Sequence, residues 1–401
     1  MRVLFCTDTY RPQVNGVSIV TALSVAGLTR LGWECAVVAP AYPEDTHQHW
    51  QGEPNPPGVQ VISLPSVALP RYPELRLALP RVSQVHRTTE GFRPNLIHCE
   101  TEFTVGRMGQ IAAARAGMPV VSSYHTNFGR YTEAYGVPWL RRGMSAYLGR
   151  FHRRSRRVYT PSTASREEVK QLGAPEVEVW GRGVDTELFH PGRRSQALRA
   201  ALGMGSGFTF LYVGRLAPEK RPGQILEAFR LASETLPRGV IHLIVAGTGP
   251  LESELRAAAA PGVTFLGLLG RQSQLPDVYA NADAFLFASV TETLGLVVLE
   301  AMASGLPVIA PPAGGVRDHL VDGENGMACP EGDAGAMARA MIRLAENWAL
   351  SRYLARGARR TAEGLSWNRE MERLDQSYQE ICAGCDAAAL IAGNQAVTVV
   401  P

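Results

Sequence analysis

The sequence has few of the features that mark several large classes of protein. Its six cysteines are scattered over 401 residues, and the pair Cys382 and Cys385 has no second pair and no nearby histidine. Neither a disulfide framework nor a zinc site is therefore indicated, and a reducing compartment is expected. The net charge is only +3, which by itself gives no reason to expect a nucleic-acid partner.

Membrane-spanning and targeting segments are not indicated either. The first ten residues, MRVLFCTDTY, become polar too early for a signal peptide. The uncharged span 12–29 contains several polar side chains, so it does not have the composition of a transmembrane helix.

Three short nucleotide-related motifs are missing as well. No GxGxxG occurs, so there is no dinucleotide fingerprint, and no GxxxxGK[ST] occurs, which argues against a P-loop ATPase. No DxD occurs, so a carboxylate-bridged Mg²⁺ is not indicated. We therefore expect no metal and no cofactor.

What the chain does contain is a repeated alternation of short apolar runs with helical patterns. Such alternation is typical of an α/β fold with a mostly parallel sheet. It starts in the first residues, stops in a Pro- and Gly-rich segment at 41–70 that we expect to form loops, and restarts at Phe208. The expected strands are 3–6, 35–39, 96–99, 119–122, 158–161, 176–180, 208–213, 241–246, 263–266, 284–288 and 307–310.

The restart of the pattern predicts two doubly wound domains. We place the first at 1–183 and the second at 184–365. A final helix at 366–386 is expected to cross back to the first domain, and 387–401 is expected to be a frayed tail.

The stretch 291–305, TETLGLVVLEAMASG, is the most informative of the second half. Its almost wholly apolar helix carries Glu300, and Glu292 lies on the loop that leads into it. A buried carboxylate is costly unless it is paired or hydrogen-bonded. Two acids at a strand–loop–helix junction favour a ligand site at the carboxyl end of a parallel sheet; the alternative is a carboxylate paired with a core arginine.

Basic and polar residues follow other expected strands at the same edge. Arg215 and Lys220 come after the strand at 208–213 and offer cations to an anionic ligand. The carboxylates suit sugar and ribose hydroxyls better than phosphates, since phosphates would be repelled. Together these residues predict a nucleotide-diphosphate site, with backbone N–H donors at the helix start.

Two stretches are basic and amphipathic. The segment 139–159 holds seven arginines and no acid, with apolar residues at helical spacing, and 75–87 is a second such stretch. This pattern favours binding to an anionic membrane surface, and the alternative is a core-packed helix with a solvated basic face. The membrane candidates are Arg76, Arg81, Arg141, Arg142, Arg150, Arg153 and Arg154.

Taken together, the motifs resemble family 4 of the retaining glycosyltransferases, which have the GT-B fold of two Rossmann-like domains facing across a cleft. The resemblance covers nearly the whole chain. The motifs that carry it are Pro12-x-x-Asn15-Gly16, His125 after a strand, GVD at 183–185, GRL…K at 214–220, GTGP at 247–250 and the E-x7-E of Glu292 and Glu300. The CETEF and YHTNF segments resemble the branch that glycosylates membrane lipids, which includes GDP-mannose-dependent α-mannosyltransferases, diacylglycerol glucosyltransferases and sulfoquinovosyl-lipid synthases.

The resemblance implies a role for each matching residue. Gly16, Arg215 and Lys220 would meet the donor diphosphate, Glu300 the ribose and Glu292 the donor sugar. Thr293, Leu294 and Gly295 would add backbone donors, Gly267 and Leu268 would border the nucleobase, and His125 would lie beside the sugar. His125, Arg215, Lys220 and Glu292 are the expected catalytic residues. The acceptor candidates are Tyr10, Glu102, Thr126 and Asn127.

The implied activity is a retaining, metal-independent α-hexosyltransferase that acts on a lipid or glycolipid at the cytoplasmic face of the cell membrane. GDP-mannose is the first choice of donor. A UDP-sugar-dependent diacylglycerol glycosyltransferase and a transferase with a soluble acceptor remain alternatives. Where many relatives have Ile-Pro-Glu after two glycines, this chain has Val316-Arg317-Asp318.

Overall fold

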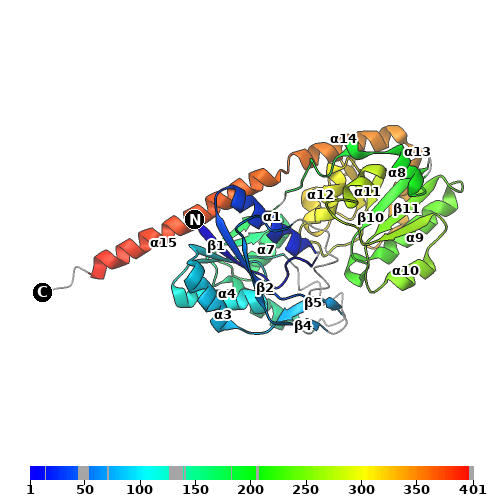
Figure 1. Cartoon of the computed structure of the whole chain (residues 1–401). Coiled ribbons are helices and arrows are strands. Elements are labelled where there is room, and N and C mark those ends of the chain that lie inside the picture. Colours follow the sequence, from blue (N-terminus) through cyan, green and yellow to red (C-terminus); the bar gives the residue numbers. More distant parts are fainter. Residues whose placement is uncertain are drawn as a thin grey trace.

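The computed structural model describes residues 1–13, 15–43, 54–69, 72–125, 139, 141–181, 183–204 and 207–396. It contains two α/β domains that lie side by side, with the last helix running along the first of them (Figure 1). Each domain is built on a parallel sheet, as the strand–helix alternation predicts.

The N-terminal domain has a seven-stranded parallel sheet in the order β3-β2-β1-β6-β7-β8-β9. Its strands are β1 (Arg2–Cys6), β2 (Glu34–Pro40), β3 (Gln60–Leu64), β6 (Leu96–Cys99), β7 (Val120–Ser123), β8 (Val158–Thr160) and β9 (Val177–Val179). The helices are α1 (Gly16–Arg30), α3 (Val82–Phe92), α4 (Thr104–Ala116), α6 (Arg141–His152) and α7 (Thr163–Gln171). Apart from Arg2 at the start of β1 and His98 in β6, the central strands β1 and β6 are apolar, and from Val3 onward they are buried on both faces, as expected for a covered parallel sheet.

The C-terminal domain has a six-stranded parallel sheet in the order β12-β11-β10-β13-β14-β15. Its strands are β10 (Phe208–Val213), β11 (Ile241–Ala246), β12 (Val263–Gly267), β13 (Ala284–Leu286), β14 (Val308–Ala310) and β15 (Gly326–Ala328). The helical elements are α8 (Gln196–Ala201), η3 (Pro218–Lys220), α9 (Pro222–Thr235), α10 (Glu252–Ala258), α11 (Leu275–Asn281), α12 (Leu296–Ala303), η4 (Gly314–Asp318), α13 (Ala334–Glu346) and α14 (Trp348–Glu363). Two apolar cores, one on each face of the sheet, hold these layers together.

The chain passes between the domains at two neighbouring points. Val184 forms a bridge with Ser366, and a side chain at Gly183 would collide with the ring of Trp367. After this crossing, α15 (Trp367–Ala396) packs against α1 and the first sheet. The indole N–H of Trp33 donates to Asp375 at 2.7 Å, and that of Trp180 donates to the carbonyl of Glu370 at 2.7 Å.

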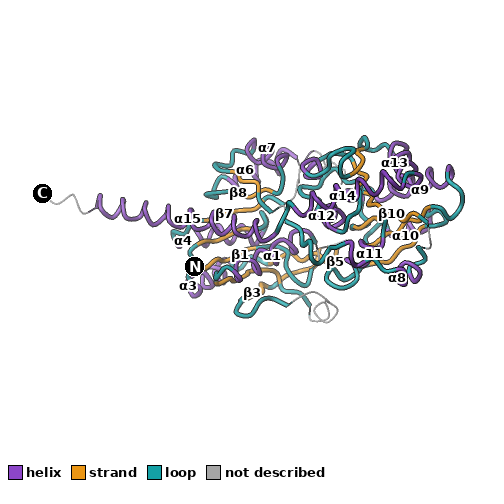
Figure 2. Tube along the Cα trace, turned by 90° about the horizontal axis from the view of Figure 1, so that it is seen from above, coloured by secondary structure: helices purple, strands orange, loops and turns teal. Residues whose placement is uncertain are grey.

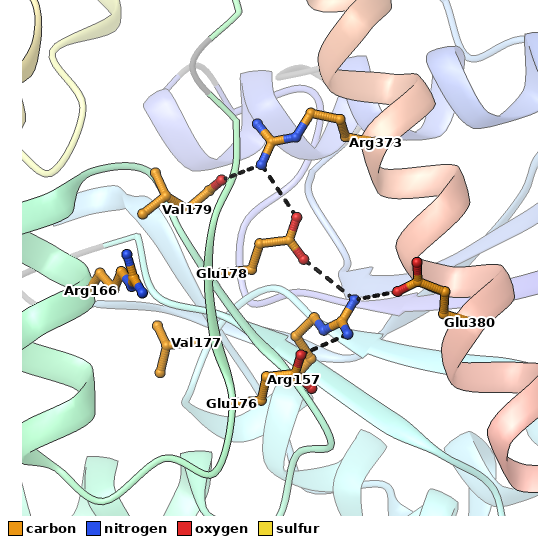
Figure 3. A pocket seen from close by; sticks show the side chains of 8 residues that line it. All are labelled: Arg157, Arg166, Glu176, Val177, Glu178, Val179, Arg373 and Glu380. Atoms are coloured by element: carbon orange, nitrogen blue, oxygen red, sulfur yellow. Dashed lines mark hydrogen bonds and ion pairs between the residues drawn. The ribbon is translucent and has the colours of Figure 1, made fainter.

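The C-terminal helix α15, which was expected to end at 386, continues to Ala396. An ion-pair network adds to its attachment at the β9 edge. Figure 3 shows Arg157 bound to Glu176, Glu178 and Glu380, and Arg373 bound to Glu178, around a shallow pocket of about 460 Å³. Its acids and bases pair with one another, and the residues predicted for the nucleotide-sugar site do not line it.

Three expectations from the sequence need correction. The segment 41–70, expected as loops, contains β3 and also β4 (Ser66–Leu69), which pairs antiparallel with β5 (Tyr72–Ala78). The basic stretch 75–87 is not one amphipathic element, since β5 ends at Ala78 and α3 starts at Val82. The basic stretch 139–159 is a helix only over α6, and its last residues enter β8.

Within the described part of the chain, no helix combines the length and the apolar character needed to cross a membrane.

Candidate active site

Both sheets change strand order beside their first strand. In the C-terminal domain β10 lies between β11 and β13, and in the N-terminal domain β1 lies between β2 and β6. Such a switch point opens a crevice at the carboxyl ends of the strands, where ligands of α/β proteins bind. The two edges meet: the Thr293 hydroxyl donates to the carbonyl of His125 at 2.5 Å, and Thr163 donates twice to Asp318.

The loop after β10 carries Arg215 and Lys220. It is held by the next βα loop, because Leu216 N–H donates to the carbonyl of Thr248 at 2.9 Å and the Tyr212 hydroxyl donates to the carbonyl of Arg215 at 3.1 Å. A Cβ at Gly247 would lie 2.0 Å from the carbonyl oxygen of Gly214, and its φ is +132°. Only glycine fits there, so the GTGP motif sets the position of the basic loop.

Lys220 and Glu292 form an ion pair across this loop. Their side chains are 22% and 20% exposed, so both reach the crevice. The backbone of Glu292 is fixed by η4: Gly315 N–H donates to its carbonyl at 2.8 Å, and a Cβ at Gly314 would lie 2.2 Å from the same oxygen. The glycine pair after β14 therefore holds the loop that presents Glu292.

Glu300 lies on α12 and is 2% exposed. Its Oε1 accepts from Nε of Arg271 at 2.9 Å, and its Oε2 accepts from the Tyr279 hydroxyl at 3.3 Å. The Arg271 guanidinium also lies 5.1 Å from the ring centroid of Phe189. Burial raises the pKa of Glu300, and the charge and hydrogen bonds of Arg271 oppose that rise.

This pair is the alternative that the sequence left open, a buried carboxylate joined to a core arginine. It does not exclude a ligand role, because Arg271 supplies the positive charge that a buried, ionised carboxylate requires. Arg271 itself lies at the end of the loop expected to border a nucleobase.

His125 lies just beyond β7 and comes from the opposite domain. Its Nε2 is 2.7 Å from Oε2 of Glu100, which follows β6 and is fully buried. Because the carbonyl of His125 contacts Thr293, the histidine lies at the junction of the domains. The structure thus brings His125 together with Thr293, and Thr293 is next to Glu292.

The remaining donor candidates lie at the same edges. Gly16 is exposed at the first position of α1, with Asn15 as the N-cap, and a Cβ there would meet nothing within 4 Å. Leu268 is 67% exposed directly after Gly267, which ends β12. Leu294 is only 7% exposed and packs in the core, while Gly295, with φ of +78°, is the N-cap of α12.

The acceptor candidates fit the structure less well. Tyr10 is 1% exposed and its hydroxyl donates to Asn55 at 2.7 Å, so it belongs to the N-terminal core, which corrects the expectation of an acceptor contact. Glu102 is 3% exposed and faces His152 at 3.5 Å. Thr126 and Asn127 lie outside the described residues.

The basic candidates are carried by separate elements. Arg76 lies in β5 and donates twice to Ser66 within the hairpin, and Arg81 is exposed just before α3. The exposed arginines of α6 and of the turn after it form the other group. Trp139, two residues before α6, is 76% exposed. That group is Arg141, Arg142, Arg150, Arg153 and Arg154. Burial and the charges of Arg107 and Arg150 lower the pKa of Arg154, as expected within a cluster of cations.

Two residues of the site were missed as contributors. Glu100 lies in the CETEF segment but was not among the predicted site residues, and neither was Arg271, three positions after Leu268. A polar residue directly after a parallel strand is the signal that would have found Glu100. No local signal indicates that Arg271 reaches a carboxylate 29 positions later.

The two Rossmann-like domains, with cations, carboxylates and a histidine gathered where their carboxyl edges meet, define a glycosyltransferase of the GT-B fold. Two family models match the chain. One described as Glycosyltransferase Family 4 matches residues 14–188, and one described as Glycosyl transferases group 1 matches residues 207–347. The protein belongs to this family of glycosyltransferases.

Relatives and solved structures agree with this assignment. A GDP-mannose-dependent alpha-mannosyltransferase of Mycobacterium tuberculosis is 33% identical over 95% of this chain and 97% of its own length. A sulfoquinovosyl transferase of Arabidopsis thaliana is 32% identical over 77% of this chain and 61% of its own length. The crystal structure of Anabaena HepE in complex with UDP-glucose has a TM-score of 0.74 and 22% identity, and the match covers 95% of this chain and 100% of that one; it supports the fold.

Proposed function

We propose that this protein is a retaining α-glycosyltransferase that moves a hexose, mannose from GDP-mannose in the first instance, to a membrane lipid or glycolipid. One observation carries the proposal. Arg215 and Lys220 follow β10 at the switch point, and Glu292 and Glu300 follow the neighbouring strand, β13. His125 lies next to them from the opposite domain.

The cations are placed for the diphosphate. Lys220 pairs with Glu292, and a bound diphosphate would also interact with the charge of that ammonium group. Arg215 and Lys220 would then stabilise the negative charge that grows on the leaving nucleotide. With two side-chain cations and the start of α12 available, the site needs no metal ion for this task. Gly16 leaves open space on the other side of the crevice, where the backbone at the start of α1 would approach the same group.

The carboxylates are placed for hydroxyls. Glu300 would accept from the ribose diol with its free lone pairs while Arg271 stays bound, and Glu292 would accept from the transferred sugar. Leu268, exposed beside Gly267, offers an apolar surface to the nucleobase. In a front-face reaction the acceptor hydroxyl attacks from the side that the diphosphate leaves, and a diphosphate oxygen takes its proton. No carboxylate then acts as a nucleophile.

The donor is tested by a panel of nucleotide sugars. Purified protein is mixed with GDP-mannose, UDP-glucose or other UDP-sugars, with and without a lipid extract, and GDP or UDP release is measured. Release from GDP-mannose that requires lipid supports the first choice. Release from UDP-glucose would favour a diacylglycerol glucosyltransferase; the alpha-monoglucosyldiacylglycerol synthase of Streptococcus pneumoniae is 30% identical over 77% of this chain. Release that depends on a soluble sugar instead of lipid would exclude the lipid acceptor.

The membrane part of the proposal rests on α6. We propose that this helix holds the enzyme at the cytoplasmic face of the cell membrane as a peripheral protein. Arg141, Arg142 and Arg150 are exposed on this helix, and Trp139, two residues before its start, is also exposed. Each arginine near an anionic bilayer contributes about 1 kcal/mol, and salt screens that attraction.

Changing these three arginines to glutamine should therefore weaken binding to anionic liposomes about 100-fold, as measured by flotation. The matched control replaces three exposed arginines of α14 in the other domain, Arg352, Arg356 and Arg360, and should float like the native protein. Flotation that is independent of anionic lipid, or equal loss in both variants, would remove the membrane surface from the proposal.

A further inference from the structure

Glu100 is a fully buried carboxylate that the reaction proposed above does not use. It follows β6, is 0% exposed, and its Oε2 lies 2.7 Å from Nε2 of His125, whose side chain is 13% exposed. A buried ionised carboxylate is unfavourable unless several donors surround it. Its neighbours should therefore explain why the chain keeps an acid at this place.

Those neighbours form a connected set. His98 lies in β6, two residues before Glu100, and is also 0% exposed. Its Nδ1 lies 3.7 Å from Oε1 of Glu100. Its Nε2 contacts the Ser123 hydroxyl at 2.7 Å, and its Nδ1 contacts the hydroxyl of Tyr378. Burial acts to raise the pKa of Glu100, but the charge that His98 carries at low pH and the hydrogen bonds of His125 and Ser123 outweigh it and lower the pKa to about 2.

The last member comes from the other end of the chain. Tyr378 lies on α15, the helix that crosses back from the C-terminal domain, and it is 0% exposed. Burial lowers the pKa of His98 to about 4, so at neutral pH this ring is uncharged. Its nitrogens contact Tyr378 and Ser123, and the ring packs beside Glu100 without a hydrogen bond to it. The crossing helix therefore supports the strand ends that present His125.

From this arrangement we infer that Glu100, supported by His98 and by Tyr378 of α15, is the positioning residue for His125. The inference rests on the proposed function in one respect, that His125 lies beside the donor sugar. An ionised carboxylate accepts only, so His125 must carry a proton on Nε2, the nitrogen that faces Glu100. The carboxylate also fixes the plane of the ring at the domain junction, where Thr293 contacts the backbone of the same residue.

Two variants and one control test the inference. Glu100→Gln keeps the shape but replaces an acceptor-only group by an amide. Tyr378→Phe removes one hydroxyl at the far end of the chain of contacts. Tyr159→Phe is the matched control, since its hydroxyl also joins the N-terminal sheet to α15, through Ser377 at 2.5 Å. Its ring packs against His98, with centroids 5.6 Å apart, and the phenylalanine keeps that ring.

The first readout is independent of turnover. Nitrogen-15 NMR of histidine-labelled protein reports the tautomer of each of the nine histidines, and a His125→Gln sample assigns the signal of interest. We expect His125 to carry its proton on Nε2 in the native protein and in Tyr159→Phe, and to become a mixture of tautomers in Glu100→Gln. An unchanged tautomer in Glu100→Gln would overturn the inference.

The second readout is transfer kinetics with whichever donor is turned over. Misplacing a group at the reacting centre costs up to about 100-fold, so kcat of Glu100→Gln should fall about 10- to 100-fold with the KM for donor nearly constant. Tyr378→Phe should lose about two- to tenfold, the contribution of one hydrogen bond, and Tyr159→Phe should keep the native rate. A kcat for Glu100→Gln within twofold of native, or equal losses in both tyrosine variants, would refute the positioning role. If the native protein turns over none of the donors, the proposed function is overturned. The NMR result then decides alone whether Glu100 positions His125.

Discussion

Replacing Lys220 by alanine tests the donor site most sharply. Its ammonium pairs with Glu292 and is expected to bind the diphosphate. The variant would lose that cation and leave Glu292 facing the diphosphate as an unbalanced negative charge. Both effects lower the rate of transfer: the first weakens donor binding, and the loss of the cation also slows departure of the leaving group.

The size of each effect follows from the geometry. Two unit charges about 4 Å apart interact by roughly 4 kcal/mol at an effective dielectric constant of 20. Since the Lys220 and Glu292 side chains are 22% and 20% exposed, we discount this to about 2 kcal/mol, or about 30-fold in donor affinity. Loss of a donor that stabilises the leaving group lowers kcat by about 100- to 1,000-fold. The expected fall in kcat/KM is therefore at least about 1,000-fold.

The assay is nucleotide release under single-donor conditions, with folding checked by circular dichroism and thermal unfolding. Lys220→Arg should recover part of the rate because it keeps the charge. Arg221→Ala is the matched control, since that neighbouring cation pairs with Glu331 at 2.8 Å and is 36% exposed; its rate should stay near native. A folded Lys220→Ala protein within tenfold of native would refute this assignment of the diphosphate site.

Three further outcomes follow from buried and interdomain contacts. Burial lowers the pKa of His98 from 6.5 to about 4, so near pH 5 the unfolded chain binds a proton there that the folded chain does not. The free energy of unfolding, measured by urea titration, should therefore fall by about 2 kcal/mol from pH 7 to pH 5, and His98→Asn should make it less dependent on pH over this range. Arg271→Leu leaves Glu300 buried without its cation, so urea unfolding should show a loss of about 3–5 kcal/mol and calorimetry should show weaker nucleotide binding; unchanged stability would mean that Glu300 is neutral in the native protein. Asp318→Ala removes two hydrogen bonds from Thr163 across the domain junction, so small-angle scattering should give a larger radius of gyration without nucleotide, and an unchanged radius would show that other contacts hold the domains together.

The sequence was sufficient to predict the two parallel sheets. Strands such as β1 and β10 are continuous apolar runs because both of their faces are covered, and the turns after them are rich in glycine. It failed for β3, which is an edge strand with mostly exposed side chains and therefore has no apolar run. The hairpin of β4 and β5 was missed because its segment is broken by prolines.

The residues of the candidate site also fall into those that the sequence predicts and those that only the packing reveals. Lys220 and Glu292 were recognisable because motif spacing places them on loops after adjacent strands. The partner of Glu300 was not, because pairing between α12 and the loop after β12 depends on how those elements pack. Tyr10 was misjudged for the same reason: only the folded structure shows its hydroxyl bound to Asn55 and its ring in the core.

The most direct test of the central claim is a crystal structure with the donor nucleotide bound. We expect the diphosphate between Arg215 and Lys220, the ribose hydroxyls on Glu300 with Arg271 still paired to it, and the sugar position next to Glu292 and His125. A nucleotide bound away from the carboxyl end of β10, or a ribose that makes no contact with Glu300, would contradict the account.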